Sequence, residues 1–495
     1  MICVSIGRGR HKQMIAEHRH LVEQGAELVE LRLDYIRTPV NLKRLLDGRR
    51  CPIVATVRRE EDGGMWQGSE EARLILLRSA IADGVDYIDL EEDVAAGIPR
   101  FGKTKRIISY HNFRETPEDL EGLHQRLVAL DPDIVKIATM AHSTHDTVRM
   151  LRLVKESKIP TVGLCMGDIG TPSRLLTGKF GAPFTYATFH QERTLAPGQL
   201  SYRQMRDIYN YDAIDEATEV FGVIADPVGH SLSPTIHNAA FRKLGMNKVY
   251  LPFRVPREDL DRFLVDCADL GIRGLSVTIP HKETILPHVA NVDESASTIG
   301  AVNTVLYGDG NSGYNTDYQA AMDSLDTAVE LGEGDLPLQG KTALLLGSGG
   351  VAKAVGYGLI QRGAKVIIAA RSDIRGDALA KKLAGTFVHW NERYAIQEDI
   401  DILVNCTPIG MHPNVDETPF EKEYMGKSFV VFDTVYNPEQ TLLIKEARDL
   451  GCRTVTGVEM FVRQAALQFK HFTDQDAPLE LMQDAVRRSI GAARG

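Results

Sequence analysis

Short apolar runs and longer amphipathic stretches alternate through about the first 200 residues of the chain. The apolar runs have the length of buried β-strands, and the stretches between them repeat at helical spacing, as at residues 70–82, 117–130 and 144–155. Eight strands alternating with helices predict a compact (β/α)8 barrel of the TIM type, in the α/β class. The eight predicted strands are Ile2–Ile6, Leu28–Leu33, Ile53–Val57, Asp86–Leu90, Arg106–Tyr110, Asp133–Ala138, Thr161–Cys165 and Phe184–Thr188.

A polar stretch at residues 210–219 ends this pattern, and its composition predicts a linker. Two further α/β patterns follow, one beginning with an apolar run at residues 220–225 and the other with a run at 342–346. A chain of 495 residues is too long for one core, so several domains are expected.

Polar side chains gather at or near the carboxyl ends of the predicted barrel strands, the face on which barrels carry their active sites. They are Glu30, Arg32 and Asp34 after the second strand, Arg58 after the third, His111 after the fifth, Lys136 within the sixth, and Arg174 and Gln199 in the loops after the seventh and eighth. We expect Arg58 and Arg174 to hold a substrate carboxylate through paired hydrogen bonds.

Lys136 lies between Val135 and Ile137 in an apolar run. Desolvation in such a strand lowers the pKa of a lysine and makes its neutral amine available to attack a carbonyl. The resulting Schiff base withdraws electrons and acidifies a neighbouring C–H bond. His111, on the adjacent predicted strand, is placed to take that proton and return it to a departing hydroxyl. These residues predict a Schiff-base lyase; the alternative is an edge-strand lysine that extends to water.

A strand, a glycine turn and the start of a helix follow one another at residues 344–352. The turn lets a helix N-terminus approach a pyrophosphate, which predicts a dinucleotide site formed by Gly347, Ser348, Gly349, Gly350, Val351 and Ala352. The next apolar run ends in Arg371 and Ser372, with Arg375 one turn further, where an NAD site usually has an acidic residue. Arginines at this position favour a 2′-phosphate, so the predicted cofactor is NADP.

The formal net charge of −10 and the absence of a basic block argue against nucleic-acid and anionic-membrane partners. A few arginines could still bind small anionic substrates. The six cysteines show no CxxC spacing, which favours a reduced, cytoplasmic protein without a structural metal. No signal peptide and no run of 18 apolar residues is visible. The oligomeric state stays open.

Residues 220–473 resemble shikimate dehydrogenase. The matching motifs are GHSLSPTIHN at 229–238, GLSVTIPHK at 274–282, GAVNT at 300–304, NTD at 315–317, NCTPIGM at 405–411, DTVYNP at 433–438 and GVEM at 457–460 with Gln464. The resemblance implies a substrate domain at 219–320 joined by helices at 457–490, and a Rossmann NADP domain at 321–456. Ser276 and Ala370 stand where the family often has Asn.

This resemblance implies roles for single residues. Lys282 would donate a proton to the carbonyl oxygen during hydride transfer, and Asp317 would keep that lysine charged and oriented. Ser231, Ser233, Thr278, Asn303 and Gln464 would hold the substrate, and Thr407, Tyr436 and Gly457 would join the cofactor site.

Residues 1–210 resemble type I 3-dehydroquinate dehydratase through ELRLD at 30–34, TVR at 56–58, SYH at 109–111, VKI at 135–137, SR at 173–174 and APGQ at 196–199. The family assigns catalysis to Lys136 and His111 and substrate binding to Glu30, Arg32, Arg58, Arg174 and Gln199. Asp62 stands where the family usually has the Glu that supports the histidine. Leu195 stands where a substrate-contacting Ser is common, and Thr194 or Ser201 could take over the role of that Ser.

The two resemblances fit one another, because dehydration of 3-dehydroquinate gives 3-dehydroshikimate, the ketone that a shikimate dehydrogenase reduces. The predicted function is therefore bifunctional. Two alternatives remain at this point. One is a class I aldolase-like lyase fused to a quinate/shikimate-type NAD(P) dehydrogenase. The other is a non-catalytic metabolite sensor built from the same domains.

Overall fold

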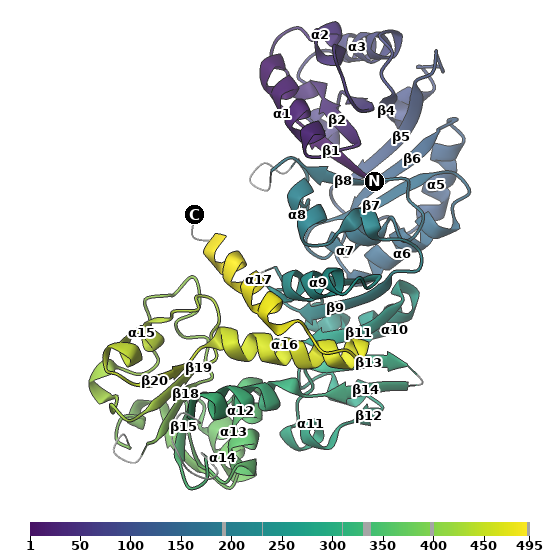
Figure 1. Cartoon of the computed structure of the whole chain (residues 1–495). Helices are drawn as coiled ribbons and strands as arrows, with labels where there is room; N and C mark the ends of the chain where they lie inside the picture. The colour runs from purple at the N-terminus through teal and green to yellow at the C-terminus, as the bar shows by residue number, and fades with distance from the viewer. Residues whose placement is uncertain (191–194, 230, 309, 330–337, 397–399, 493–495) are drawn as a thin grey trace. The chain divides into compact units, whose positions relative to one another are not determined.

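The computed structural model describes residues 1–190, 195–229, 231–308, 310–329, 338–396 and 400–492. The chain forms two compact units. The first comprises Met1–Pro234 and Gly245–Ile272, and the second comprises Thr235–Leu244 and Arg273–Gly495 (Figure 1). Each unit is described by itself.

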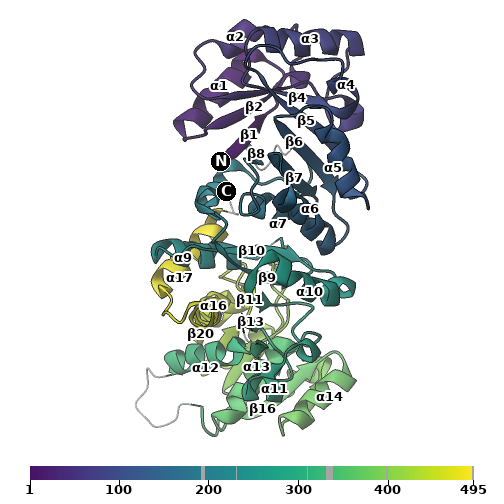
Figure 2. The same ribbon diagram turned by 90° about the vertical axis from the view of Figure 1, so that its right-hand side faces the viewer.

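Eight parallel strands form the barrel of the first unit, with helices on its outside (Figures 1 and 2). The strands are β1 (Ile2–Ile6), β2 (Leu28–Arg32), β3 (Ile53–Thr56), β4 (Tyr87–Glu91), β5 (Lys105–Asn112), β6 (Ile134–Met140), β7 (Thr161–Met166) and β8 (Thr185–Thr188). The helices are α1 (His11–Glu23), α2 (Leu42–Leu46), α3 (Glu70–Ala82), α4 (Glu92–Ala95), α5 (Leu120–Val128), α6 (Thr144–Glu156), α7 (Thr171–Leu176) and α8 (Tyr202–Asp207). The predicted barrel is confirmed, with strand ends shifted by at most two residues.

The strand order is β7-β6-β5-β4-β3-β2-β1-β8, and each neighbouring pair is hydrogen-bonded. The described residues form no ladder between β7 and β8, so the barrel is nearly closed. Inward-facing apolar side chains fill its interior, as is usual for this fold. They are Cys3, Leu28, Val54, Ile107, Ile134, Val162, Leu164, Phe184 and Tyr186. This packed floor leaves the carboxyl ends of the strands as the place for a site.

The stretch at 210–219 is more ordered than a linker. A short 3-10 helix, Tyr211–Ala213, buries the Tyr211 ring, and Thr218 Oγ1 donates to Asn247 Oδ1 at 2.6 Å. The first unit continues with the parallel pair β9 (Glu219–Ala225) and β10 (Lys248–Arg254), and with α10 (Leu260–Leu270). Polar composition predicted a linker because it cannot reveal a hydrogen bond to a residue 29 positions away.

The second unit contains a small mixed sheet and a parallel sheet. In the mixed sheet β13 (Thr304–Gly308) pairs antiparallel with β11 (Ile272–Val277) and with β14 (Gly310–Tyr314), and β14 pairs with β12 (Asn291–Val292). The helices of this part are α9 (Ser233–Lys243) from Thr235 onward, α11 (Glu294–Ile299), α12 (Thr316–Val329), α16 (Gly457–Thr473) and α17 (Leu479–Ala492).

The parallel sheet has the order β17-β16-β15-β18-β19-β20, which is the Rossmann order. Its strands are β15 (Thr342–Leu346), β16 (Lys365–Ala370), β17 (Thr386–His389), β18 (Ile402–Asn405), β19 (Val430–Asp433) and β20 (Arg453–Val455), and its helices are α13 (Gly350–Gln361), α14 (Asp373–Lys382) and α15 (Leu442–Asp449). Leu345 packs into one apolar cluster and Leu344 and Leu346 into another. The sheet is therefore buried on both faces.

Candidate active sites

A cavity at the carboxyl ends of the barrel strands brings together all seven residues predicted for the lyase site. They are Glu30, Arg32, Arg58, His111, Lys136, Arg174 and Gln199. Each comes from a different strand or its following loop, except Glu30 and Arg32, which share β2. Side chains alternate along a strand, so both of these β2 residues face the barrel interior.

The ammonium of Lys136 is buried among carboxylates and an aromatic ring. Its Nζ donates to Asp89 Oδ2 at 3.0 Å, lies 3.9 Å from Glu30 Oε1 and lies 4.2 Å from the centre of the Tyr186 ring. The expectation of a lysine in purely apolar surroundings is therefore not what the structure shows. Two buried carboxylates face the amine instead, and they hold its position inside the cavity.

These carboxylates stay ionised although they are buried. Burial alone would raise the pKa of Asp89, but Arg58 and Lys136 outweigh it and lower this pKa. Burial also acts to raise the pKa of Glu30, and Lys136 and Arg32 again lower it. Ser5 and Thr56 donate hydrogen bonds to Glu30 at 2.5 and 2.8 Å. The site thus holds fixed negative charge next to the amine.

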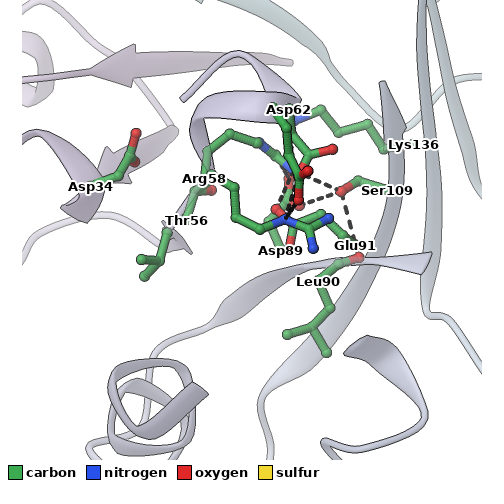
Figure 3. Close-up of polar contacts among 12 residues, drawn as sticks. Asp34, Thr56, Arg58, Asp62, Asp89, Leu90, Glu91, Ser109 and Lys136 are labelled. Atoms are coloured by element: carbon green, nitrogen blue, oxygen red, sulfur yellow. Dashed lines mark hydrogen bonds and ion pairs between the residues drawn. The ribbon is translucent and has the colours of Figure 1, made fainter. Parts of the chain in front are cut away.

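The guanidinium of Arg58 is paired with carboxylates of the protein (Figure 3). Its guanidinium lies 2.9 Å from Asp89 Oδ2 and 2.8 Å from Glu91 Oε1, and it donates to Ser109 Oγ at 3.1 Å. Burial opposes the charge of Arg58, but Asp89 and Glu91 raise its pKa. Arg32 is likewise paired with a carboxylate, that of Asp34, at 2.7 and 3.0 Å.

Arg174 differs from both, because no carboxylate among the described residues is paired with it. Its side chain is buried, Nη2 donates to the carbonyl of Pro197 at 3.2 Å, and Nε has no partner within the described part of the chain. Burial lowers the pKa of Arg174 to about 10. A buried cation without a counter-ion is costly, so this guanidinium marks a place for an external anion.

His111 lies in the same cavity as a neutral imidazole. Burial, Arg58 and Lys136 together lower its pKa well below the usual value, and Asp89 opposes them more weakly. Its Nδ1 is buried and has no hydrogen-bond partner in the described residues. Asp62 does not bind it; its carboxylate accepts from Arg59 Nε at 2.6 Å. A neutral, unpaired ring nitrogen is suited to accept a proton.

Sequence reasoning missed four residues of this site: Asp89, Glu91, Ser109 and Tyr186. Asp89 carried a usable signal, because it is a charged residue inside an apolar run, as Lys136 is. Of the two proposed substitutes for the missing serine, Thr194 lies outside the described residues. Ser201 caps α8 through Gln204.

In the second unit, Lys282 and Asp317 form an ion pair. Lys282 Nζ donates to Asp317 Oδ2 at 2.6 Å, and both side chains are largely buried. A Cβ built on Gly350 would lie 3.5 Å from Lys282 Cδ, so the lysine runs beside the first turn of α13. The pair therefore borders the predicted dinucleotide turn.

A hydrogen-bonded network of amides and hydroxyls reaches Thr316, the residue before Asp317. Asn303 Oδ1 accepts from the Thr316 backbone N–H at 2.9 Å, and Gln464 Nε2 donates to the Phe461 carbonyl at 2.9 Å. Ser276 donates to Gln468 Oε1 at 2.7 Å, which makes Gln468 a further residue that the sequence did not reveal. Thr278 follows β11 and is half-buried, whereas Ser231 and Ser233 belong to the first unit, where Ser233 N–H donates to Ser231 Oγ.

The glycine turn has the backbone that a nucleotide requires. Gly347 has φ +114°, and a Cβ there would lie 3.2 Å from the Cys406 carbonyl oxygen and from Thr407 Cγ2. Ser348, Gly349, Gly350 and Val351 are half-buried, and Ala352 is buried as α13 begins. Beyond β16, Arg371, Ser372 and Arg375 are exposed. The turn and these arginines fit a dinucleotide that carries a 2′-phosphate.

Two further residues predicted for the cofactor site, Tyr436 and Gly457, lie in the loop after β19 and at the start of α16. The Tyr436 ring stacks on Phe461 at 4.3 Å, and a Cβ on Gly457 would lie 2.2 Å from the Val435 carbonyl oxygen. Only glycine permits that approach at the start of α16. No group of three metal-ligating side chains occurs in the described residues. No helix in the same ranges has the length and apolar character needed to cross a membrane.

Four known protein families match successive parts of the chain. Type I 3-dehydroquinase matches residues 2–216, and the shikimate dehydrogenase substrate binding domain matches 223–305. Shikimate/quinate 5-dehydrogenase matches residues 330–433, and the shikimate 5'-dehydrogenase C-terminal domain matches 457–487. These matches leave no support for an aldolase as the N-terminal half.

Individual relatives agree with this division. The bifunctional 3-dehydroquinate dehydratase/shikimate dehydrogenase of Arabidopsis thaliana, a chloroplastic protein, is 39% identical over 97% of this chain and 83% of its own. The NADP(+) shikimate dehydrogenase of Methanopyrus kandleri is 41% identical over 55% of this chain and 97% of its own.

A crystal structure of a shikimate dehydrogenase in complex with NADP+ covers 56% of this chain and 97% of its own length, with 36% identity and a TM-score of 0.53. The match to the plant protein spans both halves in the same order. The chain belongs to the family of bifunctional 3-dehydroquinate dehydratase/shikimate dehydrogenases.

Proposed function

We propose that this chain catalyses two consecutive reactions. The barrel dehydrates 3-dehydroquinate to 3-dehydroshikimate through a Schiff base, and the second unit reduces 3-dehydroshikimate to shikimate with NADPH. The observation that carries the proposal is the cavity in which a buried lysine, a neutral histidine and an uncompensated arginine converge. It fits a substrate that has both a ketone and a carboxylate.

In the first reaction, the Lys136 amine adds to the substrate ketone and water leaves, which produces an iminium. Asp89, 3.0 Å from Nζ, and Glu30 favour positive charge at this nitrogen and so stabilise the iminium electrostatically. Arg174 binds the substrate carboxylate, and the paired arginines Arg32 and Arg58 hold the surrounding carboxylates in place.

His111 then removes the proton next to the iminium carbon, and an enamine forms. His111 then gives this proton to the hydroxyl at the β-position, which leaves as water. The imidazole of His111 is neutral again. Hydrolysis of the iminium releases 3-dehydroshikimate and restores the Lys136 amine. The low pKa of His111 suits this order, because the imidazole begins unprotonated and has no competing partner on Nδ1.

In the second reaction, bound NADPH supplies the hydride for the ketone. Lys282 donates a proton to the carbonyl oxygen on which negative charge develops, and Asp317 orients the ammonium through its 2.6 Å hydrogen bond. Thr278, Asn303 and Gln464, all in the second unit, are proposed to bind the substrate. The same role for Ser231 and Ser233 stays a prediction. The turn at Gly347–Ala352, Arg371, Ser372, Arg375, Thr407, Tyr436 and Gly457 are proposed to hold the nucleotide.

A single assay tests both reactions. The full chain is incubated with 3-dehydroquinate and NADPH, and shikimate is measured together with NADPH consumption. We expect shikimate in a one-to-one ratio with oxidised NADPH. Accumulation of 3-dehydroshikimate without NADPH consumption would contradict the second activity. Absence of any dehydration would favour a non-catalytic sensor and would contradict the first.

A further inference from the structure

A buried carboxylate that takes no part in the proposed chemistry lies at the carboxyl end of the Rossmann sheet. Asp433 is the last residue of β19 and is fully buried. Its Oδ1 accepts from Asn405 Nδ2 at 2.9 Å and from the Val435 backbone N–H at 3.0 Å. Its Oδ2 accepts from Thr441 Oγ1 at 2.6 Å. Three donors from three different segments therefore meet at one carboxylate.

Asn405 extends this network into the loop after β18. Its Oδ1 accepts from the backbone N–H of Thr407 at 2.9 Å and from Thr407 Oγ1 at 2.7 Å. Its backbone carbonyl accepts from the N–H and the hydroxyl of Thr434, at 3.1 and 2.8 Å. The loop after β18 and the loop after β19 are thus fastened to the same Asp433–Asn405 pair.

Both loops follow strands at the carboxyl end of the Rossmann sheet, where the dinucleotide site is proposed. The first contacts the glycine turn, because a Cβ on Gly347 would lie 3.2 Å from atoms of Cys406 and Thr407. The second lies against the start of α16, where Gly457 approaches the Val435 carbonyl. A shift of either loop would therefore change the space in which the pyrophosphate and the nicotinamide must fit.

The carboxylate is retained in a place that disfavours its charge. Burial raises the pKa of Asp433 to about 6, although hydrogen bonds from Thr441, Val435 and Asn405 oppose that rise. A buried ionisable group of this kind costs stability relative to an apolar residue of similar size. Ionisable groups with perturbed pKa values cluster at functional sites.

We propose that Asp433 is a positioning residue for the nucleotide, which sets the register of the two loops that wall its site through hydrogen bonds to Asn405 and to the Val435 backbone. The inference rests on the proposed function, because it assigns these walls to an NADP site. Asp433 does not touch the reacting atoms; it acts through Asn405, Thr407 and the backbone that follows β19.

The test compares Asp433→Asn with a matched control, Asp401→Asn, in the full chain. Asp401 stands before β18, at the opposite edge of the same sheet, where it accepts from Thr342 N–H and pairs with Lys341, both at 2.9 Å. NADPH affinity is measured by fluorescence titration, and kcat is measured at saturating NADPH.

For Asp433→Asn we expect the NADPH Kd to rise about tenfold, which corresponds to about 1.4 kcal/mol. The kcat at saturation should change less than about threefold, because the interaction contributes to binding in ground and transition states alike. For Asp401→Asn the Kd should stay within about twofold of wild type even if thermal stability falls. A purely structural carboxylate would give the same Kd in both variants.

A second variant covers the case in which Asp433→Asn does not fold. Thr441→Val removes one of the three donors and leaves the carboxylate, and we expect a smaller rise in Kd. A folded Asp433→Asn with unchanged Kd, or an unchanged Kd in Thr441→Val when Asp433→Asn is unfolded, overturns the inference. If the wild-type chain binds no NADPH, the proposed function fails and the inference fails with it.

Discussion

The two candidate active sites differ in how many charged side chains they bury. In the barrel, four arginine and lysine side chains and three carboxylates are buried around one cavity, the members being Arg32, Arg58, Lys136, Arg174, Glu30, Asp89 and Glu91. In the second unit, the candidate site has one ion pair, Lys282 with Asp317, next to a glycine turn and to a network of amides and hydroxyls that reaches Thr316. The density of buried charge differs strongly between them.

The difference follows from the source of the reactive group. The barrel must make its own electron sink, so it has to bury a lysine and then stabilise positive charge there by nearby carboxylates. The dehydrogenase site receives its hydride from a cofactor, so the protein needs mainly a shaped surface and one proton donor. Substitutions should therefore have larger effects in the barrel than in the nucleotide site.

The largest effect should come from Lys136→Ala. Loss of the amine removes the Schiff base, so dehydration should fall below about 0.1% of the wild-type rate, while ketone reduction stays unchanged. Borohydride added to the wild-type enzyme during turnover should leave a mass increase on the peptide that contains Lys136. The exposed Lys105, replaced by alanine, is the control. An adduct on another lysine would refute the assignment.

Arg174→Gln should mainly weaken the binding of 3-dehydroquinate, whereas Arg58→Gln should mainly lower the stability of the fold. The first removes the cation without a carboxylate partner, so the KM for 3-dehydroquinate should rise about 10- to 100-fold, the scale of a charge-assisted hydrogen bond of about 1.5–3 kcal/mol. Its folding stability should change little. Arg58→Gln removes a buried cation that lies between Asp89 and Glu91 and leaves them only Lys136 and Arg73 as cationic partners. It should lower the free energy of unfolding by up to about 3–5 kcal/mol.

Those two variants are compared by dehydratase kinetics and by urea unfolding. Two results would contradict the expected difference between the variants. The first is a lower stability of Arg174→Gln than of Arg58→Gln, and the second is a rise in KM for Arg58→Gln without a loss of stability. The second result would mean that the substrate carboxylate is held by Arg58, despite its contacts with Asp89 and Glu91. The first would mean that Arg174 is needed for folding.

In the dehydrogenase site, Arg371→Ala should weaken NADPH binding by about 1.5–3 kcal/mol, because a charge-assisted hydrogen bond to the 2′-phosphate is lost. NADH lacks that phosphate and should be affected little. Titration of both nucleotides checks the expectation, with Arg375→Ala as the neighbouring comparison. Equal losses for NADPH and NADH would remove the reason for assigning NADP specificity to Arg371.

The smallest expected effect is in the pH dependence of dehydration. A general base works while neutral, and the lowered pKa of His111 keeps it neutral well below pH 6.5. The dehydratase kcat/KM should therefore change less than about twofold between pH 6 and 7.5 as far as His111 is concerned, whereas a histidine at the usual value would lose about fourfold. A pH–rate profile with an acidic limb centred at 6.5 would contradict the structure.

The residues of the barrel site could be predicted because polar side chains at strand ends share one mouth. The surroundings of Lys136 could not. Val135 and Ile137 flank it in sequence, but alternate residues of a strand point to opposite faces, so they reveal nothing about the lysine's environment. Its actual neighbour, Asp89, lies 47 residues away. Contacts of this kind between different strands determine which charges surround the lysine. The pattern of residues near Lys136 in the sequence does not reveal them.

The same limit separates Arg58 from Arg174. Both were predicted as carboxylate ligands, and only the structure distinguishes the arginine with two carboxylate partners from the one without any among the described residues. In the second unit the strands and the turn were readable from the sequence. The hydrogen bonds that join Asp433 to Asn405 depend on the parallel pairing of β18 with β19, which the sequence does not state.

The uncompensated charge of Arg174 has a practical consequence for the choice of buffer. Any small oxyanion that enters the cavity should relieve the cost of burying that guanidinium, and a ligand that binds only the folded state raises the melting temperature. Phosphate or sulfate buffers would then stabilise the barrel and also compete with substrate. Purification and storage would benefit from such salts, whereas kinetic assays are best run in buffers whose anions are too large for the cavity.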